Sequence, residues 1–527
     1  MTPLRERASM EIERSTLSGR AKGLRSADGA TDRFLGLPYA SPPVGALRWR
    51  APQRLAPWRD VRDATRFGDA SLQRTRPRDS IMYFGDESSS EDCLYLNVWA
   101  PTQAKGPHPV LVWIHGGGFY YGSGSLPKYD GEALARLGAV VVTINYRLGP
   151  LGFLAHPWLS AEGDGASSGN YGLLDQIAAL EWVRDNIEAL GGDPSRVTIF
   201  GQSVGSASVN SLMASPLARG LFQGAIAQSG GSMGHLGPAG SGCMQTLGGA
   251  EAAGEAFVRD LGAASIEALR GMPAHLVQYA GLGPDADEKD YMARLHTIRR
   301  SGWPIVDGPV LERSNHETFR RGLQAQVPLI TGWNEAEGSI SPVPKTWEAL
   351  EASLQSTYGD HATLILAHYR NGAREPGEVA QLIIGHRSFC WQNHAMARLH
   401  GPVQPVFAYQ FTHAPPMPSG ASFCENAASD LGAFHTAEIP YVFANLHVRN
   451  WPYGARDHEL AAQMSRYWVR FAATGDPNGE GLPHWPHYTG SSPSVLRFGD
   501  ATAAAPEPMP ETFALWESYF AAAARHV

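Results

Sequence analysis

Val197-Thr198-Ile199-Phe200-Gly201-Gln202-Ser203-Val204-Gly205 joins a short apolar run to the pattern G-x-S-x-G. The first four residues are apolar or β-branched and predict a strand, and residues 206–214 can continue as a helix. A strand that turns tightly into a helix through this pattern holds the serine oxygen above a sheet and places the next backbone N–H beside it. The stretch therefore predicts an α/β-hydrolase fold with Ser203 as a nucleophile.

The same pattern occurs three times, in a chain with 58 glycines among 527 residues. A polar loop rather than a strand precedes the match around Ser167. The match around Ser232 does follow a predicted strand, but Gly234-His235-Leu236-Gly237-Pro238 breaks any helix behind it. The strand before Ser203 and the helix after it favour Ser203 among the three.

Other segments predict the sheet to which this turn belongs. Apolar runs alternate with helical segments, which is typical of a mostly parallel sheet with helices on both faces. The apolar spacing of Leu173–Leu190 predicts a helix that ends at Gly191-Gly192-Asp193-Pro194, and Pro510–Ala524 predicts the last helix. The predicted strands are 110–114, 140–144, 197–200, 225–227 and 328–331.

The chain shows no internal repeat and no linker that would separate independent domains. We therefore expect residues 1–527 to form one domain. The segments at about 234–325 and 341–400 lack a clear sheet pattern, and we expect them to be largely helical insertions that cap the sheet.

The composition argues against several classes of protein. Lys and Arg number 43 against 51 Asp and Glu, a net charge of −8, and no basic stripe is present, so nucleic acid is not an expected partner. No apolar stretch approaches the roughly 20 residues that cross a bilayer. The segment Met1–Arg7 mixes both charge signs and no apolar region follows it, so we expect no leader peptide and a cytoplasmic location.

The cysteines do not form a metal-binding or redox motif. A C-x-x-C pair is typical of a zinc or redox site, and none occurs among Cys93, Cys243, Cys390 and Cys424.

A glycine-rich segment follows an earlier predicted strand. Trp113-Ile114 leads into His115-Gly116-Gly117-Gly118-Phe119, and consecutive glycines let the backbone turn its N–H groups toward a close ligand. α/β-Hydrolases take an oxyanion donor from the loop after an early strand. We expect the N–H groups of Gly117, Gly118 and Val204 to stabilise the oxyanion of an acyl-transfer reaction.

The remaining members of a triad should follow in the order acid, then histidine. The strand predicted at 328–331 runs into a segment in which Glu335 and Glu337 are both candidates. His435 lies in the compact loop 431–440 and is the favoured histidine. The alternatives to it are His413, His447 and His484. The residues alone leave both choices open.

Together these segments resemble the type-B carboxylesterase/lipase family, which includes the cholinesterases. The resemblance extends along most of the chain. It implies a serine carboxylesterase that acts on a small ester through an acyl-enzyme intermediate, with no metal or organic cofactor. The matching segments include Phe34–Ala40, Glu91–Val98, His115–Phe119, Gly169–Gln176, Gly191–Pro194, Gln228–Gly230, Val306–Gly308 and Thr474–Asn478.

The resemblance also implies roles for single residues. The acid of the family is the Glu directly before a Gly, which corresponds to Glu337, and its histidine lies in a Gly-x-x-His segment, which corresponds to His435. Ser229 corresponds to a serine that helps to hold the acid. The oxyanion donors of the family correspond to Gly117, Gly118 and Val204.

Three positions depart from the family pattern. Neutral Gln202 replaces the Glu that usually precedes the nucleophile, so we expect a shifted pH profile. Val204 replaces the common Ala, which should narrow the acyl side while its N–H remains a donor. Ser71 stands near the position of the cysteine that pairs with Cys93 in secreted members. We therefore expect Cys93 to be unpaired, as in an intracellular enzyme of bacterial type.

Two other activities are compatible with the sequence. The same triad would serve an amidase or a carbamate hydrolase, and relatives in cell adhesion keep the fold without catalysis. Those relatives typically lack the nucleophile and carry a signal peptide and a membrane anchor. Hydrolysis is the favoured function because this chain keeps Ser203, Glu337 and His435.

Overall fold

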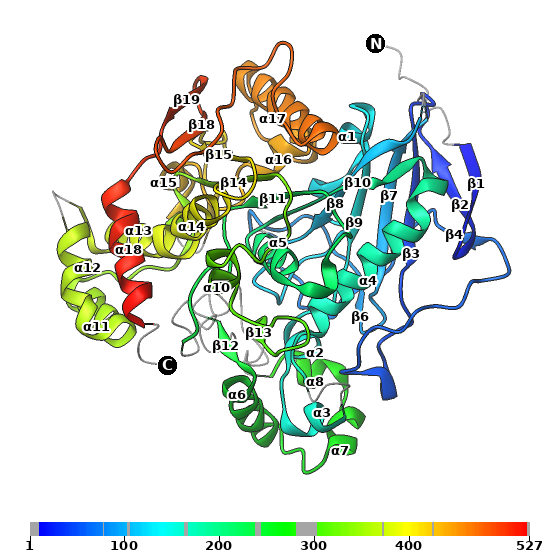
Figure 1. The fold of residues 1–527 in the computed structure, drawn as a ribbon, viewed down its shortest axis with the longest axis horizontal. Coiled ribbons are helices and arrows are strands. Elements are labelled where there is room, and N and C mark those ends of the chain that lie inside the picture. The colour runs from blue at the N-terminus through cyan, green and yellow to red at the C-terminus, as the bar shows by residue number, and fades with distance from the viewer. Residues whose placement is uncertain are drawn as a thin grey trace.

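The computed structural model describes residues 10–76, 78, 80–102, 106–162, 167–237, 244–280, 303–370, 374–423 and 426–523. Its centre is a large twisted sheet with helices packed on both faces (Figure 1). A short strand, β4 (Arg62–Asp63), pairs beside the second strand of this sheet. Across the sheet, the other strands follow in the order β1 (Met10–Thr16), β2 (Gly19–Arg25), β3 (Thr31–Pro38), β7 (Tyr95–Pro101), β9 (Val140–Ile144), β8 (His108–Ile114), β10 (Gly192–Gln202), β11 (Gly224–Gln228), β14 (Leu329–Asn334), β15 (Val406–Phe411), β18 (Ser494–Phe498) and β19 (Thr502–Pro506).

The middle of the sheet is parallel. The strands from β9 to β18 run in one direction, whereas β1, β2, β3 and β7 at one edge and β19 at the other pair antiparallel. All five strands predicted from the sequence are present. β10 is longer than predicted: it extends from Gly192 to Gln202, whereas the prediction covered 197–200. The prediction of a mostly parallel α/β sheet is confirmed.

The side chains of β8 explain why the parallel strands have continuous apolar sequences. Val112 belongs to the core beneath α4 (Tyr171–Asn186) and α5 (Val204–Ala214). Its neighbour Trp113 belongs to the core beneath α17 (Ala455–Thr474) on the other face. Successive side chains of a strand point to opposite faces, so a strand covered on both sides needs apolar residues at every position.

The two helices predicted in detail are present. The helix expected over Leu173–Leu190 forms as α4 and continues into a 3-10 turn at Ile187–Leu190. Gly191 ends it with a φ of 91°, in the left-handed region that favours glycine at helix ends. The last helix is α18 (Pro510–Ala523).

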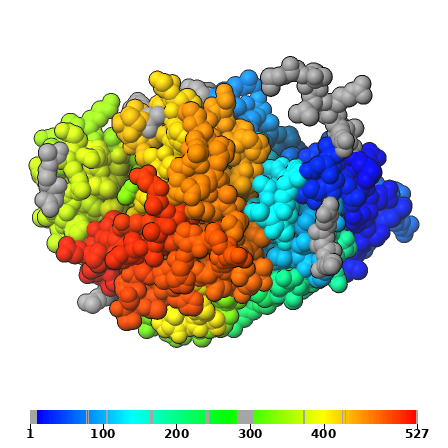
Figure 2. Space-filling view, turned by 90° about the horizontal axis from the view of Figure 1, so that it is seen from above, coloured from blue at the N-terminus to red at the C-terminus, as the bar shows by residue number. Residues whose placement is uncertain are grey.

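Helices also occupy both segments that were expected to cap the sheet, although residues 281–302 of the first lie outside the described residues. In Figure 2 the second segment forms one end of the visible face and the N-terminal strands form the other, with C-terminal elements between them. The helices of the first segment are α6 (Leu247–Asp260), α7 (Ile266–Gly271), α8 (Ala274–Gln278) and α10 (Asn315–Arg320). Those of the second are α11 (Trp347–Tyr358), α12 (Ala362–Tyr369), α13 (Pro376–Gly385) and α14 (Trp391–His400).

Cys93 and Cys390 are buried free thiols. Ser71 lies beside the Cys93 thiol, and burial raises the pKa of that thiol far above its usual value. The prediction that Cys93 is unpaired is confirmed. Cys243, Cys424 and the segment Met1–Arg7 lie outside the described residues. Within the described parts of the chain, every helix is too short or too polar to cross a membrane.

Candidate active site

Ser203 lies in the tight turn between β10 and α5. Its backbone has a φ of 60° and a ψ of −124°, a region in which residues other than glycine are strained. Close backbone contacts surround the turn. A Cβ at Gly201 would lie 2.5 Å from the backbone oxygen of Gly205, and a Cβ at Gly205 would lie 2.1 Å from that of Ile114. The two glycines of the G-x-S-x-G pattern are therefore required for steric reasons.

The Ser203 side chain is half-buried and lines a cavity of ≈ 540 Å³. The two rival serines are absent from the described lining of this cavity. Ser167 donates a hydrogen bond to Asp307 Oδ2 at 2.9 Å. Ser232 follows β11, but the described residues directly behind it, up to 237, contain no helix. Of the three serines, Ser203 is the one held at a strand-to-helix turn beside a cavity.

The segment His115–Phe119 follows β8 and folds against the Ser203 turn. A Cβ at Gly116 would lie 3.1 Å from the Cβ of Ser203. Gly117 and Gly118 have φ values of 117° and 68°, so the backbone here takes a path that favours glycine. The predicted oxyanion donors that line the cavity beside Ser203 are Gly117, Gly118 and Val204. Their joint donation to an oxyanion stays a prediction.

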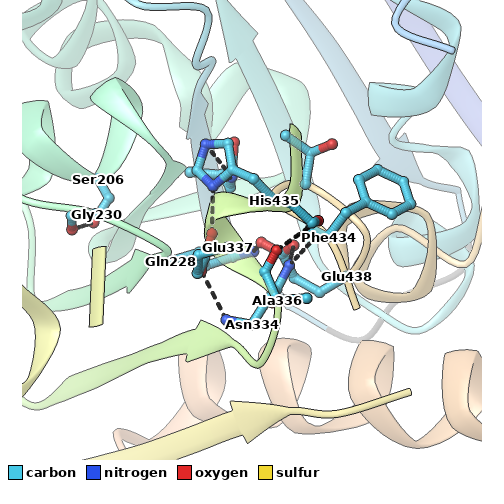
Figure 3. A network of polar contacts seen from close by, with 12 residues as sticks. Ser206, Gln228, Gly230, Asn334, Ala336, Glu337, Phe434, His435 and Glu438 are labelled. Atoms are coloured by element: carbon cyan, nitrogen blue, oxygen red, sulfur yellow. Dashed lines mark hydrogen bonds and ion pairs between the residues drawn. The ribbon is translucent and has the colours of Figure 1, made fainter. Parts of the chain in front are cut away.

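An acid and a histidine from distant parts of the chain meet beside the cavity. Glu337 follows β14, and its Oε2 lies 2.5 Å from Nδ1 of His435 (Figure 3). The other oxygen of Glu337 accepts the backbone N–H of Asn334 at 2.7 Å. Glu337 and His435 are both buried, whereas Glu335 is exposed. Of the two candidate acids, the structure places Glu337 beside His435 and leaves Glu335 in solvent.

The surroundings of His435 differ from those of the other candidate histidines. Its ring lines the cavity and packs on Phe389, with ring centroids 4.2 Å apart. His413 instead contacts Asp457 Oδ1 at 2.8 Å through its Nε2. The other two alternatives, His447 and His484, have side chains exposed to solvent.

Gln202 is buried against the edge of the His435 ring. Its Nε2 lies 3.2 Å from Nε2 of His435 and 3.4 Å from Nδ1. No hydrogen bond joins Ser203 to His435 among the described residues, although both side chains line the same cavity. The neutral amide of Gln202 adds no negative charge beside the imidazole, and its effect on the pH profile stays a prediction.

A second carboxylate, Glu438, lies near the Glu337–His435 pair, beside Asn334 (Figure 3). It is fully buried at the start of α16 (Ile439–Val442) and accepts hydrogen bonds from Asn334 Nδ2 at 2.7 Å and Gln228 Nε2 at 3.2 Å. Burial, and then the nearby charge of Glu337, raise the pKa of Glu438. The same Asn334 amide group also donates to the Phe434 carbonyl at 2.8 Å, next to His435. Asn334 thus links the acid, the second carboxylate and the histidine loop.

Asn334 and Gln228 were not among the predicted site residues, although the segment Gln228–Gly230 carries part of the family resemblance. Each is the last residue of a buried parallel strand, β14 and β11 respectively. A polar side chain directly after an apolar run lies at the carboxyl edge of the sheet, where ligand sites of α/β proteins occur. A polar residue at the end of an apolar run could therefore have identified both Asn334 and Gln228 as candidates for the site.

Ser229, expected to help to hold the acid, is buried with a φ of 52°. Its hydroxyl has no hydrogen-bond partner among the described residues, so the expected contact with Glu337 is not made in the structure. The two oxygens of Glu337 are held instead by His435 and the Asn334 backbone. The supporting role of Ser229 stays a prediction.

Comparisons with known proteins identify the family of this chain. Residues 6–516 match the carboxylesterase family. The chain is 40% identical over 508 residues to a fumonisin B1 esterase of Sphingopyxis macrogoltabida, covering 93% of this chain and 86% of that protein. It is 36% identical to a phenmedipham hydrolase of Pseudarthrobacter oxydans, covering 89% and 92% of the two chains. The solved structure of a thermophilic PNB esterase superposes with a TM-score of 0.81 at 32% identity, over 96% of this chain and 100% of that one. This chain has the α/β-hydrolase fold, belongs to the carboxylesterase family and is a carboxylic ester hydrolase.

Proposed function

We propose that this chain hydrolyses carboxylic esters through an acyl-enzyme on Ser203, with His435 as the base and acid and Glu337 as its orienting partner. The observation that carries the proposal is the 2.5 Å contact between Glu337 Oε2 and His435 Nδ1, at the wall of the cavity that Ser203 also lines. A carboxylate in this position keeps the proton on Nδ1 and leaves Nε2 unprotonated, so that it can act as a base. The Gln202 amide contacts Nε2 at 3.2 Å, and the proposed reaction requires that the Ser203 hydroxyl replace this contact.

In the first step, Ser203 Oγ attacks the ester carbonyl carbon while His435 Nε2 takes the hydroxyl proton. The carbonyl π electrons move to oxygen, and the N–H groups of Gly117, Gly118 and Val204 stabilise the negative charge that forms there. When the carbonyl reforms, the bond to the alcohol oxygen breaks and His435 returns its proton to the departing alcohol.

In the second step, water attacks the Ser203 ester while His435 accepts one proton from the water. The tetrahedral oxyanion is stabilised by the same N–H groups. Its collapse releases the carboxylic acid, and His435 returns a proton to Ser203. The steps use side chains and backbone groups of this chain, the ester and water.

A fluorophosphonate probe tests the nucleophile directly, because it forms a covalent bond with an activated serine. We expect the full-length enzyme to lose activity against 4-nitrophenyl butyrate as one probe is incorporated, and mass spectrometry to locate the label at Ser203. A Ser203→Ala variant should neither hydrolyse the ester nor react. Labelling at Ser167 or Ser232, or full activity without labelling of Ser203, would overturn the proposal.

The reaction class is tested with 4-nitrophenyl esters from acetate to palmitate, together with matched anilides and carbamates. We expect short esters to give the highest kcat/KM. A preference for anilides or carbamates over esters would reassign the same triad to amide or carbamate hydrolysis.

A further inference from the structure

Arg387 occupies an unusual position in the cavity wall. It lies in the π-helical turn His386–Cys390 that joins α13 to α14, and such interruptions of an α-helix are frequent at functional sites. The Arg387 residue is 4% exposed, yet it lines the cavity that also contains Ser203 and His435. A permanently charged guanidinium is therefore buried at the wall of the reaction cavity.

The guanidinium lacks partners for most of its donors. Nε and Nη1 form no hydrogen bond with any described residue. Nη2 approaches Ser388 Oγ at 3.4 Å, and the guanidinium lies 5.6 Å from the centre of the Tyr358 ring and also interacts with the Tyr358 hydroxyl. None of the described carboxylates forms an ion pair with Arg387. Because burial of an unpaired charge is costly, donors that face a cavity in this way indicate that a bound anion completes the site.

A second buried basic side chain lines the same cavity. Lys128 is 8% exposed, and its Nζ lies 4.6 Å from the Phe84 ring and 5.0 Å from the Tyr129 ring. Burial lowers the pKa of Lys128 to about 7, so Arg387 is the stronger source of positive charge. In the described lining, Glu87 is the carboxylate that opposes these charges, and it already accepts a hydrogen bond from Ser123 Oγ at 2.5 Å. The basic members of the lining are Arg74, Arg76, Lys128 and Arg387. The described lining thus holds more basic than acidic side chains, although the whole chain has a net charge of −8.

The position of Arg387 is tied to the reacting groups. Phe389, two residues further along the same turn, packs on the His435 ring at 4.2 Å. A guanidinium presents parallel N–H groups that match the two oxygens of a carboxylate. An anion bound at Arg387 would therefore be held in the same cavity as an ester carbonyl at Ser203.

We propose that the preferred substrates of this enzyme are esters that carry a free carboxylate, which Arg387 binds through its unpaired N–H groups. This inference rests on the proposed hydrolysis at Ser203 and adds the charge of the substrate to it. The unpaired donors of the buried Arg387 guanidinium favour such esters over neutral ones of the same size.

Matched ester pairs test the preference. For a carboxylate in the acyl part, mono-4-nitrophenyl glutarate is compared with 4-nitrophenyl pentanoate, which has the same chain length without the charge. For a carboxylate in the alcohol part, 3-acetoxybenzoate is compared with its neutral analogue 3-acetoxybenzamide. We expect the unmodified enzyme to have at least a tenfold higher kcat/KM for the charged member of one of the two pairs.

The Arg387→Gln variant should reduce the ratio of charged to neutral kcat/KM by about tenfold to a hundredfold, as expected for the loss of charge-assisted hydrogen bonds. Most of this change should appear in KM. Arg387→Lys keeps the charge without the paired N–H groups and should have an intermediate ratio. Arg370→Gln is the matched control. Arg370 lies in the same insertion, is paired with Glu351 and is absent from the described lining, so the ratio should not change.

An unchanged ratio in Arg387→Gln, or no preference in the unmodified enzyme, would overturn the inference. If the variant does not fold, inhibition of the unmodified enzyme gives the answer. Glutarate should inhibit hydrolysis of 4-nitrophenyl pentanoate more strongly than glutaramide, and equal inhibition would again contradict the inference. Neutral esters hydrolysed at Ser203 without any charge preference would leave the proposed function intact, whereas absence of all hydrolysis would refute that function itself.

Discussion

Glu335 and Glu337 are two residues apart and have opposite surroundings. The residues alone left both as candidates for the acid, and the family resemblance selected Glu337. In the structure Glu335 is exposed while Glu337 contacts His435. The order of residues after a strand does not determine which of two nearby carboxylates turns inward, because that depends on contacts such as the one from the Asn334 backbone.

These two residues form a matched pair for mutation. Glu337→Gln keeps the size of the side chain but removes the carboxylate that orients His435, so we expect kcat for 4-nitrophenyl butyrate to fall by about 10³- to 10⁴-fold. Glu335→Gln removes a similar charge from the exposed neighbour and should leave kcat within about twofold of the unmodified value. Circular dichroism should show both variants folded. Equal losses in the two variants would contradict the assignment of Glu337.

Strands in the parallel middle of the sheet were predictable, whereas several at the edges were not. β8 and β9 are covered on both faces and are apolar throughout, so their sequences alone indicate strands. β1 is mostly exposed, and its buried residue is Ile12. β1 pairs antiparallel with β2 from Met10 to Thr16 and has no apolar run. Its sequence therefore lacks the hydrophobic pattern that marks β8 and β9 as strands.

A substitution at the junction of β10 and α5 tests whether the close packing of α5 against β8 is required. Gly205 and Gly248 are both the second residue of a helix, α5 and α6 respectively. Gly205→Ala would place a methyl group 2.1 Å from the Ile114 oxygen, so α5 must move away from β8 together with the Val204 N–H. We expect the free energy of unfolding to fall by about 1–3 kcal/mol and ester hydrolysis to fall at least tenfold.

Gly248→Ala is the control, because no atom lies within 4 Å of the added Cβ. It should raise the free energy of unfolding by about 0.5–1 kcal/mol, since alanine favours the helix, and it should leave activity unchanged. Urea unfolding followed by circular dichroism measures both variants. If Gly205→Ala were as stable and as active as Gly248→Ala, the close packing of α5 against β8 would not be required.

The cavity depends on the assembly of the whole molecule. Its described lining includes Lys128, Ser203, Arg387 and His435, which are separated by up to 307 positions along the chain (435 minus 128). Ser203 could be predicted because a sequence pattern marks the turn that carries it, whereas His435 was selected among four histidines by the family resemblance. Arg387 could not be predicted, since its place in the wall results from the packing of α13 and α14 against the site and no local pattern records that packing.

Burial also determines how the whole molecule responds to acid. His316 in α10 is 4% exposed, and its ring packs against that of His235 with centroids 3.9 Å apart. Neither ring nitrogen of His316 has a partner among the described residues. Burial, with the neighbouring His235 and Arg398, lowers the pKa of His316 to about 3. In the unfolded chain the imidazole takes up a proton below its usual pKa of about 6.5. The unfolded state therefore binds more protons between these two values, and stability is lost as the pH falls from about 6.5 toward 3.

We therefore expect His316→Leu to be less sensitive to acid than the unmodified chain. Between pH 7.5 and pH 5.0, the buried imidazole should cost about 2 kcal/mol of the free energy of unfolding, and the variant should be spared this loss. Urea unfolding at the two pH values measures the difference. His458→Leu, which removes an exposed imidazole from α17, should keep the acid sensitivity of the unmodified chain. If His316→Leu lost as much stability as His458→Leu over this interval, the buried neutral state of His316 would be refuted.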